Sequence, residues 1–154
     1  MKFVDLLKPE AVKVVSAVTS KKRLMHDVSD LAESAYGLSA QVTVEALMER
    51  ETLGPTGVGH GVALPHARVA GLTDVVGAFI LLERPIDFEA VDRQPVDLVF
   101  SLFAPEEAGV EHLKALALVS RTLRQETLCA KLRANPDPQT LFTILTESEA
   151  VKAA

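Results

Sequence analysis

The clearest feature of the amino-acid sequence is a pair of nearly continuous apolar runs, each as long as a β-strand. They comprise Val75 to Leu82 and Val96 to Phe103. Strands covered on both faces give continuous apolar runs, whereas strands with one solvated face alternate between apolar and polar residues. The two runs therefore predict central strands of a buried sheet. The prolines and charges of Arg84 to Phe88 and Asp92 to Pro95 predict a surface connection between them.

The N-terminal part of the sequence predicts another strand followed by a helix. After a break at Lys8-Pro9, the β-branched segment Val12 to Val18 has the composition of a strand. Ser20 is a typical N-cap residue, and Gly37 is a typical helix terminator because glycine tolerates the left-handed conformation. Residues 21–36 carry apolar side chains at helical spacing between these two signals. These side chains are Leu24, Val28, Leu31, Ala32 and Ala35.

Further helices are predicted in the rest of the chain. A second helix begins after Ser39 and ends at Arg50-Glu51, before a glycine-rich turn. A long helix covers Val110 to Arg124, and two shorter helices follow, separated at Asn135 to Pro138. The tail from Ala150 to Ala154 is expected to fray. The apolar positions of the long helix are Leu113, Leu116, Ala117 and Leu123.

The alternation of helices and strands predicts the fold class α/β. At 154 residues with 48% hydrophobic content, the chain is large enough for one well-buried core and short for two. We therefore expect a single-domain sandwich over residues 1–154, in which helices flank a central mixed β-sheet, with a folded core over about residues 4–148.

Composition narrows the function classes. A net charge of −5 and a pI of about 5.4 argue against a nucleic-acid binder, because such proteins contact phosphates mainly through lysine and arginine. The longest apolar runs are far shorter than the roughly 20 residues that span a bilayer, so membrane insertion is not expected. The single cysteine, Cys129, can form no internal disulfide, which fits a reducing compartment. We therefore expect a cytoplasmic protein.

The four histidines are the natural candidates for nucleophilic chemistry, because a neutral imidazole can form a covalent phosphoryl intermediate. His26 falls on the side of the first helix opposite its apolar stripe, together with Lys22, Ser29 and Glu33, which favours a solvated surface residue. His66 follows Pro65 at the end of a short apolar segment, which suggests a strand-to-loop junction. By itself, however, this position favours a structural or merely polar role.

His60 precedes His66 by six residues. If both lie on one extended strand, they share a face but stand roughly 20 Å apart and cannot bind one metal ion. The sequence also lacks the closely paired ligands of a zinc site, so no metal is expected. His60 either lines the rim of the site or lies in the loop without a role, and its position does not separate these alternatives.

His112 and Arg50 are two candidate neighbours of a reactive histidine. His112 is followed at helical spacing by apolar residues, which places it at the inward edge of the first turn of its helix. A helix N-terminus attracts anions, so support of a phosphoryl group and simple packing are equally open. Arg50 closes the second helix, where it either complements the helix dipole or binds a phosphoryl group in a bidentate manner.

Three separate segments of the chain occur together in a recognisable order. They are Arg50 to Gly59, Gly61 to His66 and Gln94 to Phe100. Together they resemble the fructose/mannitol/nitrogen class of enzyme IIA, a component of the bacterial phosphoenolpyruvate-dependent phosphotransferase system. The resemblance extends over roughly Val4 to Ser148 and includes the helix start at Glu111 to Leu113.

This resemblance implies a phosphoryl carrier of the α/β type that needs no cofactor. It implies that His66 receives the phosphoryl group from a phosphohistidine on a carrier protein, HPr or its paralogue NPr, and that Arg50 and His112 are active-site neighbours. The resemblance also suggests Nε2 as the phosphorylated atom. There are two departures from the family pattern: His60 replaces a common asparagine, and Ala67-Arg68 replaces glycine and a variable residue. Arg68 either assists docking or phosphoryl binding, or is simply solvated.

Within this class, the chain is more similar to the stand-alone nitrogen regulatory type than to a sugar-specific IIA. The segments that favour this type are Leu53 to Gly59 and Leu123 to Cys129. Its output would be the binding of regulatory target proteins. One alternative is a fructose or mannitol IIA that passes phosphate to a IIB transport component. The other is a binding module that recognises a partner without phosphorylation.

Overall fold

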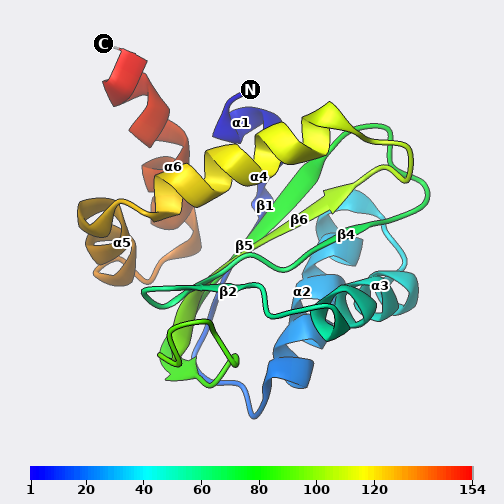
Figure 1. Ribbon diagram of the computed structural model, residues 1–154. Coiled ribbons are helices and arrows are strands. Elements are labelled where there is room, and N and C mark those ends of the chain that lie inside the picture. The colour runs from blue at the N-terminus through cyan, green and yellow to red at the C-terminus, as the bar shows by residue number, and fades with distance from the viewer. Residues whose placement is uncertain (154) are drawn as a thin grey trace.

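The structure is a computed structural model that describes the backbone of residues 1–153 and the side chains of residues 1–147. Over these residues it contains one six-stranded mixed sheet and six helices (Figure 1). The strands are β1 Leu7–Val15, β2 Gly57–Gly59, β3 Val62–Ala63, β4 His66–Arg68, β5 Val76–Ile86 and β6 Val96–Ala104. The helices are α1 Phe3–Leu6, α2 Lys21–Tyr36, α3 Ala40–Thr52, α4 Val110–Leu123, α5 Glu126–Arg133 and α6 Pro138–Ala153.

The sheet is built around β5 and β6, the two apolar runs that were predicted to be central. Its strand order is β1-β5-β6-β3-β2, and β4 also pairs with β6, beyond the end of β3. The β5–β6 and β2–β3 pairs are antiparallel, whereas β1–β5, β3–β6 and β4–β6 are parallel. The prediction of an α/β fold with a mixed sheet is thereby confirmed.

Helices cover both faces of the sheet. The α2–α3 pair lies on one face, and α1, α4 and α6 lie on the other (Figure 1). On the second face the ring of Phe100 packs edge-on against Phe3 at 5.5 Å and beside Phe79 at 6.0 Å. All three phenylalanines are fully buried, so the core lies between the sheet and its helices.

The predicted capping signals of α2 are confirmed. The Ser20 hydroxyl accepts a hydrogen bond from the Arg23 backbone N–H, and Gly37 ends the helix with a φ of 74°. Within the helix the polar face is narrower than expected. Ser29 is buried and donates its hydroxyl to the Met25 carbonyl, and His26 is half-buried rather than solvated.

The bounds of two strands differ from the prediction, and both strands run through prolines. The strand predicted over Val12 to Val18 stops at Val15, short of its predicted end, and starts earlier. β1 begins at Leu7 and ends at Val15, so it includes Pro9, which was expected to lie in a break. β5 continues to Ile86 and includes Pro85, which was expected in a surface connection. In both strands the proline falls where the pairing register shifts, and β1 is also an edge strand. Edges and bulges tolerate the missing N–H of proline.

The C-terminal helices follow the prediction with two differences. α4 buries His112 as expected but exposes 68% of Leu113, because the inward face follows other positions. The inward residues are His112, Ala115, Leu118, Val119, Thr122 and Leu123. The last helix, α6, spans 16 residues and is therefore not shorter than α4. The tail predicted to fray, Ala150 to Ala154, lies outside the residues whose side chains are described.

Candidate functional site

His66 is the first residue of β4, and a central strand fixes its backbone. It pairs in parallel register with Leu102 of β6, immediately beyond the β3–β6 pairing. The sequence predicted a strand-to-loop junction, whereas the structure places His66 at the start of a short strand. His66 is half-buried.

The surroundings of the His66 ring define which nitrogen carries the proton. Nδ1 lies 2.8 Å from the carbonyl oxygen of Leu64. A carbonyl oxygen only accepts hydrogen bonds, so Nδ1 carries the hydrogen of the neutral ring. The lone pair of the neutral imidazole is therefore on Nε2. Geometry thus places the lone pair of the neutral ring on Nε2, the nitrogen that the resemblance suggested for phosphorylation.

His112 lies against His66 from the first turn of α4. The two ring centroids are 5.6 Å apart at an interplanar angle of 72°. His112 is only 7% exposed, and its Nε2 has no hydrogen-bond partner among the described residues. The N-cap residue of α4, Gly109, supplies no side-chain cap, so the N–H groups of the first turn are not capped by it. This corner of the fold therefore suits an anion that accepts hydrogen bonds.

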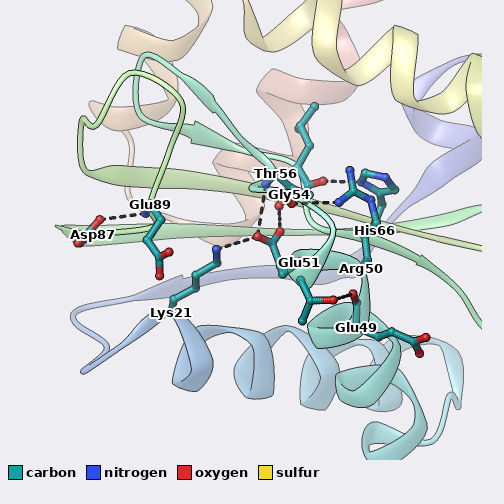
Figure 2. A network of polar contacts seen from close by, with 11 residues as sticks. Lys21, Glu49, Arg50, Glu51, Gly54, Thr56, His66, Asp87 and Glu89 are labelled. Carbon is teal, nitrogen blue, oxygen red and sulfur yellow. Dashed lines mark hydrogen bonds and ion pairs between the residues drawn. The ribbon is translucent and has the colours of Figure 1, made fainter.

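Arg50 approaches the same ring from α3. Its side chain extends from the last turn of the helix toward His66 (Figure 2). The guanidinium Nη1 donates to the Gly54 carbonyl oxygen at 3.0 Å, which anchors it to the turn after α3. A guanidinium has five N–H groups, so donors other than this one can bind an anion.

Both rings of the site have pKa values below the ordinary histidine value of 6.5. For His66, burial is the main cause, and the positive charge of Arg50 lowers the pKa further, against the opposing Leu64 carbonyl and Glu51 carboxylate. For His112, burial again dominates, followed by repulsion from His66 when that ring is protonated and from the positive charge of Arg68. Both imidazoles are therefore neutral at neutral pH, which is the nucleophilic form.

Arg68 follows His66 by two residues on β4 and is exposed. Its Nη1 donates to the Glu106 carbonyl oxygen at 2.9 Å, in the segment that leads into α4. The structure thus gives Arg68 a defined contact, next to the helix that carries His112. This contact holds the segment before α4 against β4.

His60 does not share a strand with His66. It lies in the turn between β2 and β3 with a φ of 57°, so the condition of one extended strand, under which the two histidines were compared, does not hold. Its backbone N–H donates to Asp92 at 2.9 Å, and its carbonyl accepts from Arg133 at 2.9 Å. The residue lines a cavity of about 270 Å³ beside α5, together with Cys129 and Arg133.

Comparison with known proteins bears directly on this arrangement. Residues 5–148 match the family described as phosphoenolpyruvate-dependent sugar phosphotransferase system, EIIA 2. The chain belongs to this family. A nitrogen regulatory protein of Bradyrhizobium diazoefficiens is 44% identical to this enzyme IIA over 153 residues, which cover 99% of this chain and 100% of the relative.

Two further relatives place this enzyme IIA within its family. The crystal structure of the nitrogen regulatory protein IIA-Ntr from Neisseria meningitidis superimposes with a TM-score of 0.84 at 38% identity, covering 92% of this chain and 97% of that one. A fructose-specific EIIA component of Haloferax volcanii is 32% identical over 139 residues, covering 90% of each chain. The protein is thus a phosphotransferase component of the phosphoryl-accepting regulator type, related to sugar-specific IIA proteins.

The structure brings together the three residues singled out in the sequence, and it adds others that sequence reasoning missed. The ring of His66 lies close to both His112 and Arg50, and the role of the three residues in phosphoryl transfer stays a prediction. Glu51 and Thr56 join them, because Glu51 lies next to Arg50 and accepts two hydrogen bonds from Thr56 (Figure 2). The only sequence signal for this pair was that Thr56 lies in the glycine-rich turn, five residues after Glu51.

Two further features concern the described part of the chain as a whole. None of the helices described between residues 1 and 153 combines the length and apolar character that a membrane crossing requires. In the same part of the chain, no group of three or more histidine, cysteine, aspartate or glutamate side chains is arranged to hold a metal ion.

Proposed function

We propose that Nε2 of His66 accepts a phosphoryl group from the phosphohistidine of a carrier protein of the HPr or NPr type. The observation that carries this proposal is that the ring of His66, with its lone pair on Nε2, lies beside the ring of His112, whose buried Nε2 has no hydrogen-bond partner among the described residues. A buried nitrogen without a partner costs free energy, and a phosphoryl oxygen that accepts its hydrogen removes that cost.

The chemistry is a displacement at phosphorus. The N–P bond to the carrier imidazole breaks while the N–P bond to Nε2 of His66 forms, and the carrier imidazole leaves with the bonding electron pair. The Nδ1–H of His66 stays on its nitrogen, held by the Leu64 carbonyl. Arg50 and His112 donate hydrogen bonds to the phosphoryl oxygens, which stabilises the charge on the transferring group.

We further propose a regulatory output, in the cytoplasm, for which the surface next to His112 is suited. Phosphorylation adds about −1.5 to −2 charges at the ring. Val110 and Leu113 lie beside His112 on α4 and are 63% and 68% exposed, so the new charge is next to apolar surface that a partner protein can cover. A partner that packs on these side chains is therefore sensitive to the phosphorylation state.

The first prediction tests the acceptor residue. Incubation with phosphoenolpyruvate, enzyme I and either HPr or NPr is expected to give acid-labile, alkali-stable phosphate on the protein. His66→Ala is expected to abolish this label, because it removes the nucleophilic Nε2. Phosphate is measured on the intact protein by mass spectrometry after treatment with acid or with alkali.

His26→Ala is the matched control, because it removes a histidine on α2 and is expected to leave the label intact. Label that persists in His66→Ala, or an unlabelled wild-type protein, would contradict the proposal, and the second result would leave the phosphorylation-independent binding module. Rapid discharge of labelled protein to a sugar-specific IIB component would contradict the regulatory part. A comparison of HPr with NPr identifies the donor.

A further inference from the structure

A continuous series of polar contacts connects α2 to the turn before β2. Lys21 forms an ion pair with Glu51, with Nζ and Oε2 2.7 Å apart. The Glu51 carboxylate also accepts hydrogen bonds from the backbone N–H and the hydroxyl of Thr56. Figure 2 shows the three side chains in this order. The Glu51 side chain is only 6% exposed, and a carboxylate that is buried in this way depends on its partners.

The series continues from Thr56 to the reactive ring through backbone groups. The Thr56 carbonyl accepts the Leu64 N–H at 2.9 Å, next to the β2–β3 pairing. The Leu64 carbonyl in turn accepts the Nδ1–H of His66 at 2.8 Å. Thr56 is 3% exposed, so its position is determined by these contacts and by packing. Glu51 is therefore connected to the His66 ring by three successive hydrogen bonds.

The same turn is also held from the neighbouring residue of α3. Arg50 donates to the carbonyl of Gly54, while Glu51 accepts from Thr56 two residues later. Lys21 is itself packed over the ring of Phe88, 4.6 Å from its centroid. The positions of the Arg50 guanidinium and the Leu64 carbonyl thus depend on one clamped segment.

We infer that Lys21, Glu51 and Thr56 are positioning residues that hold the Leu64 carbonyl where it keeps the His66 ring in the Nδ1–H tautomer. The inference rests on the proposed function, in which Nε2 attacks the phosphoryl group. None of the three residues needs to touch that group. They act by keeping the nucleophilic lone pair on Nε2 and aimed out of the site.

The second prediction separates this role from a merely structural one. Thr56→Val removes the hydroxyl and keeps the shape, and Glu51→Gln removes the charge that pairs with Lys21. Long-range proton–nitrogen NMR spectra of the unphosphorylated proteins report the tautomer of His66. We expect Nδ1–H in the wild type and a mixture with the Nε2–H tautomer in both variants. The rate of phosphorylation is expected to fall at least about tenfold.

Matched controls are available on α3, the helix that carries Glu51. Thr52→Val and Glu49→Gln make the same chemical changes at exposed positions of α3 and are expected to keep the wild-type tautomer and rate. Thr56→Ser, which retains the hydroxyl, is expected to restore both. Should Thr56→Val fail to fold, Glu51→Gln and Lys21→Met, with Lys22→Met as its control, provide the same comparison.

The outcomes distinguish this inference from the proposed function. Unchanged His66 tautomer and rate in folded Thr56→Val and Glu51→Gln, even with lower thermal stability, would overturn the positioning role. If the wild-type protein takes up no phosphate, the proposed function is overturned. An altered His66 tautomer in the variants would still show in that case that the contacts determine the state of the ring.

Discussion

At the residue scale, the two histidines of the site have different charged neighbours. Burial is the main reason why the pKa of each ring is low. Beyond burial, Arg50 lowers the pKa of His66, whereas the pKa of His112 is lowered by His66 and by Arg68. The site thereby keeps both rings neutral and still provides positive charge for an incoming phosphoryl group.

The third prediction follows from the different charged neighbours of His66 and His112. Arg50→Gln is expected to raise the pKa of His66, because a positive charge that opposes its protonation is removed. Arg68→Gln is expected to raise the pKa of His112 for the same reason. NMR titration of the ring signals measures both values in each variant. Each substitution serves as the control for the other. The assignment of Arg50 to His66 and of Arg68 to His112 would be contradicted if Arg50→Gln shifted the pKa of His112 instead and Arg68→Gln that of His66.

At the element scale, the β2–β3 turn that precedes the site is attached to α5. Arg133 binds Asp97 through Nε and Nη2, and its Nη2 also donates to the His60 carbonyl. Gly61 lies against this contact and has a φ of 80°. A Cβ at that position would lie 2.5 Å from Arg133 Nη2 and 3.0 Å from Asp97 Oδ1. The turn is therefore fixed by a contact that only glycine permits.

The fourth prediction concerns Gly61→Ala. The substitution adds the strain of an alanine at positive φ and also displaces Arg133 from Asp97 and His60. Gly71→Ala is the matched control, because Gly71 has a φ of 93° with open space around it. We expect about 1–2 kcal/mol of destabilisation for the control and at least about 1 kcal/mol more for Gly61→Ala. Urea unfolding measures the difference, and equal losses would contradict the role of the contact.

At the scale of the whole molecule, the site couples stability to pH. His66 and His112 both lie where sheet and helices meet, and their pKa values are lower in the folded chain than the ordinary value of 6.5. The unfolded chain therefore binds protons more readily at these two residues. Their contribution to stability is complete above pH 6.5 and is lost as the pH falls from there toward the folded pKa values.

The fifth prediction is a fall in the free energy of unfolding between pH 8 and pH 5.5. The expected size is on the order of 1 kcal/mol once the partial exposure of His66 is taken into account. The carboxylates of Asp92 and Asp137 have pKa values below the ordinary 3.8, so their protonation affects stability only at a pH below 5.5. Denaturant titrations at several pH values measure the slope. A double variant, His66→Gln with His112→Gln, is expected to flatten it, and an unchanged slope would contradict the assignment.

The elements that the sequence predicted best are those with local signals. The bounds of α2 agree with the prediction because Ser20 and Gly37 act within one turn of the helix. The apolar runs identified β5 and β6 because a central strand is buried on both faces. The ends of β1 and β5 were predicted less well. Whether Pro9 or Pro85 interrupts a strand depends on edges and register shifts, which only the assembled sheet defines.

For the candidate site, the sequence by itself determined which residue types are present: His66 after a proline, His112 at a helix start and a cationic Arg50, which only the resemblance to enzyme IIA joined into one site. The tertiary structure alone decided how they combine. Pairing of both β3 and β4 with β6 sets the Leu64 carbonyl against Nδ1 of His66, and packing of α2 against α3 brings Lys21 to Glu51. These contacts join residues and backbone atoms whose separations are defined only after the sheet and its helices have packed, so no local sequence pattern contains them.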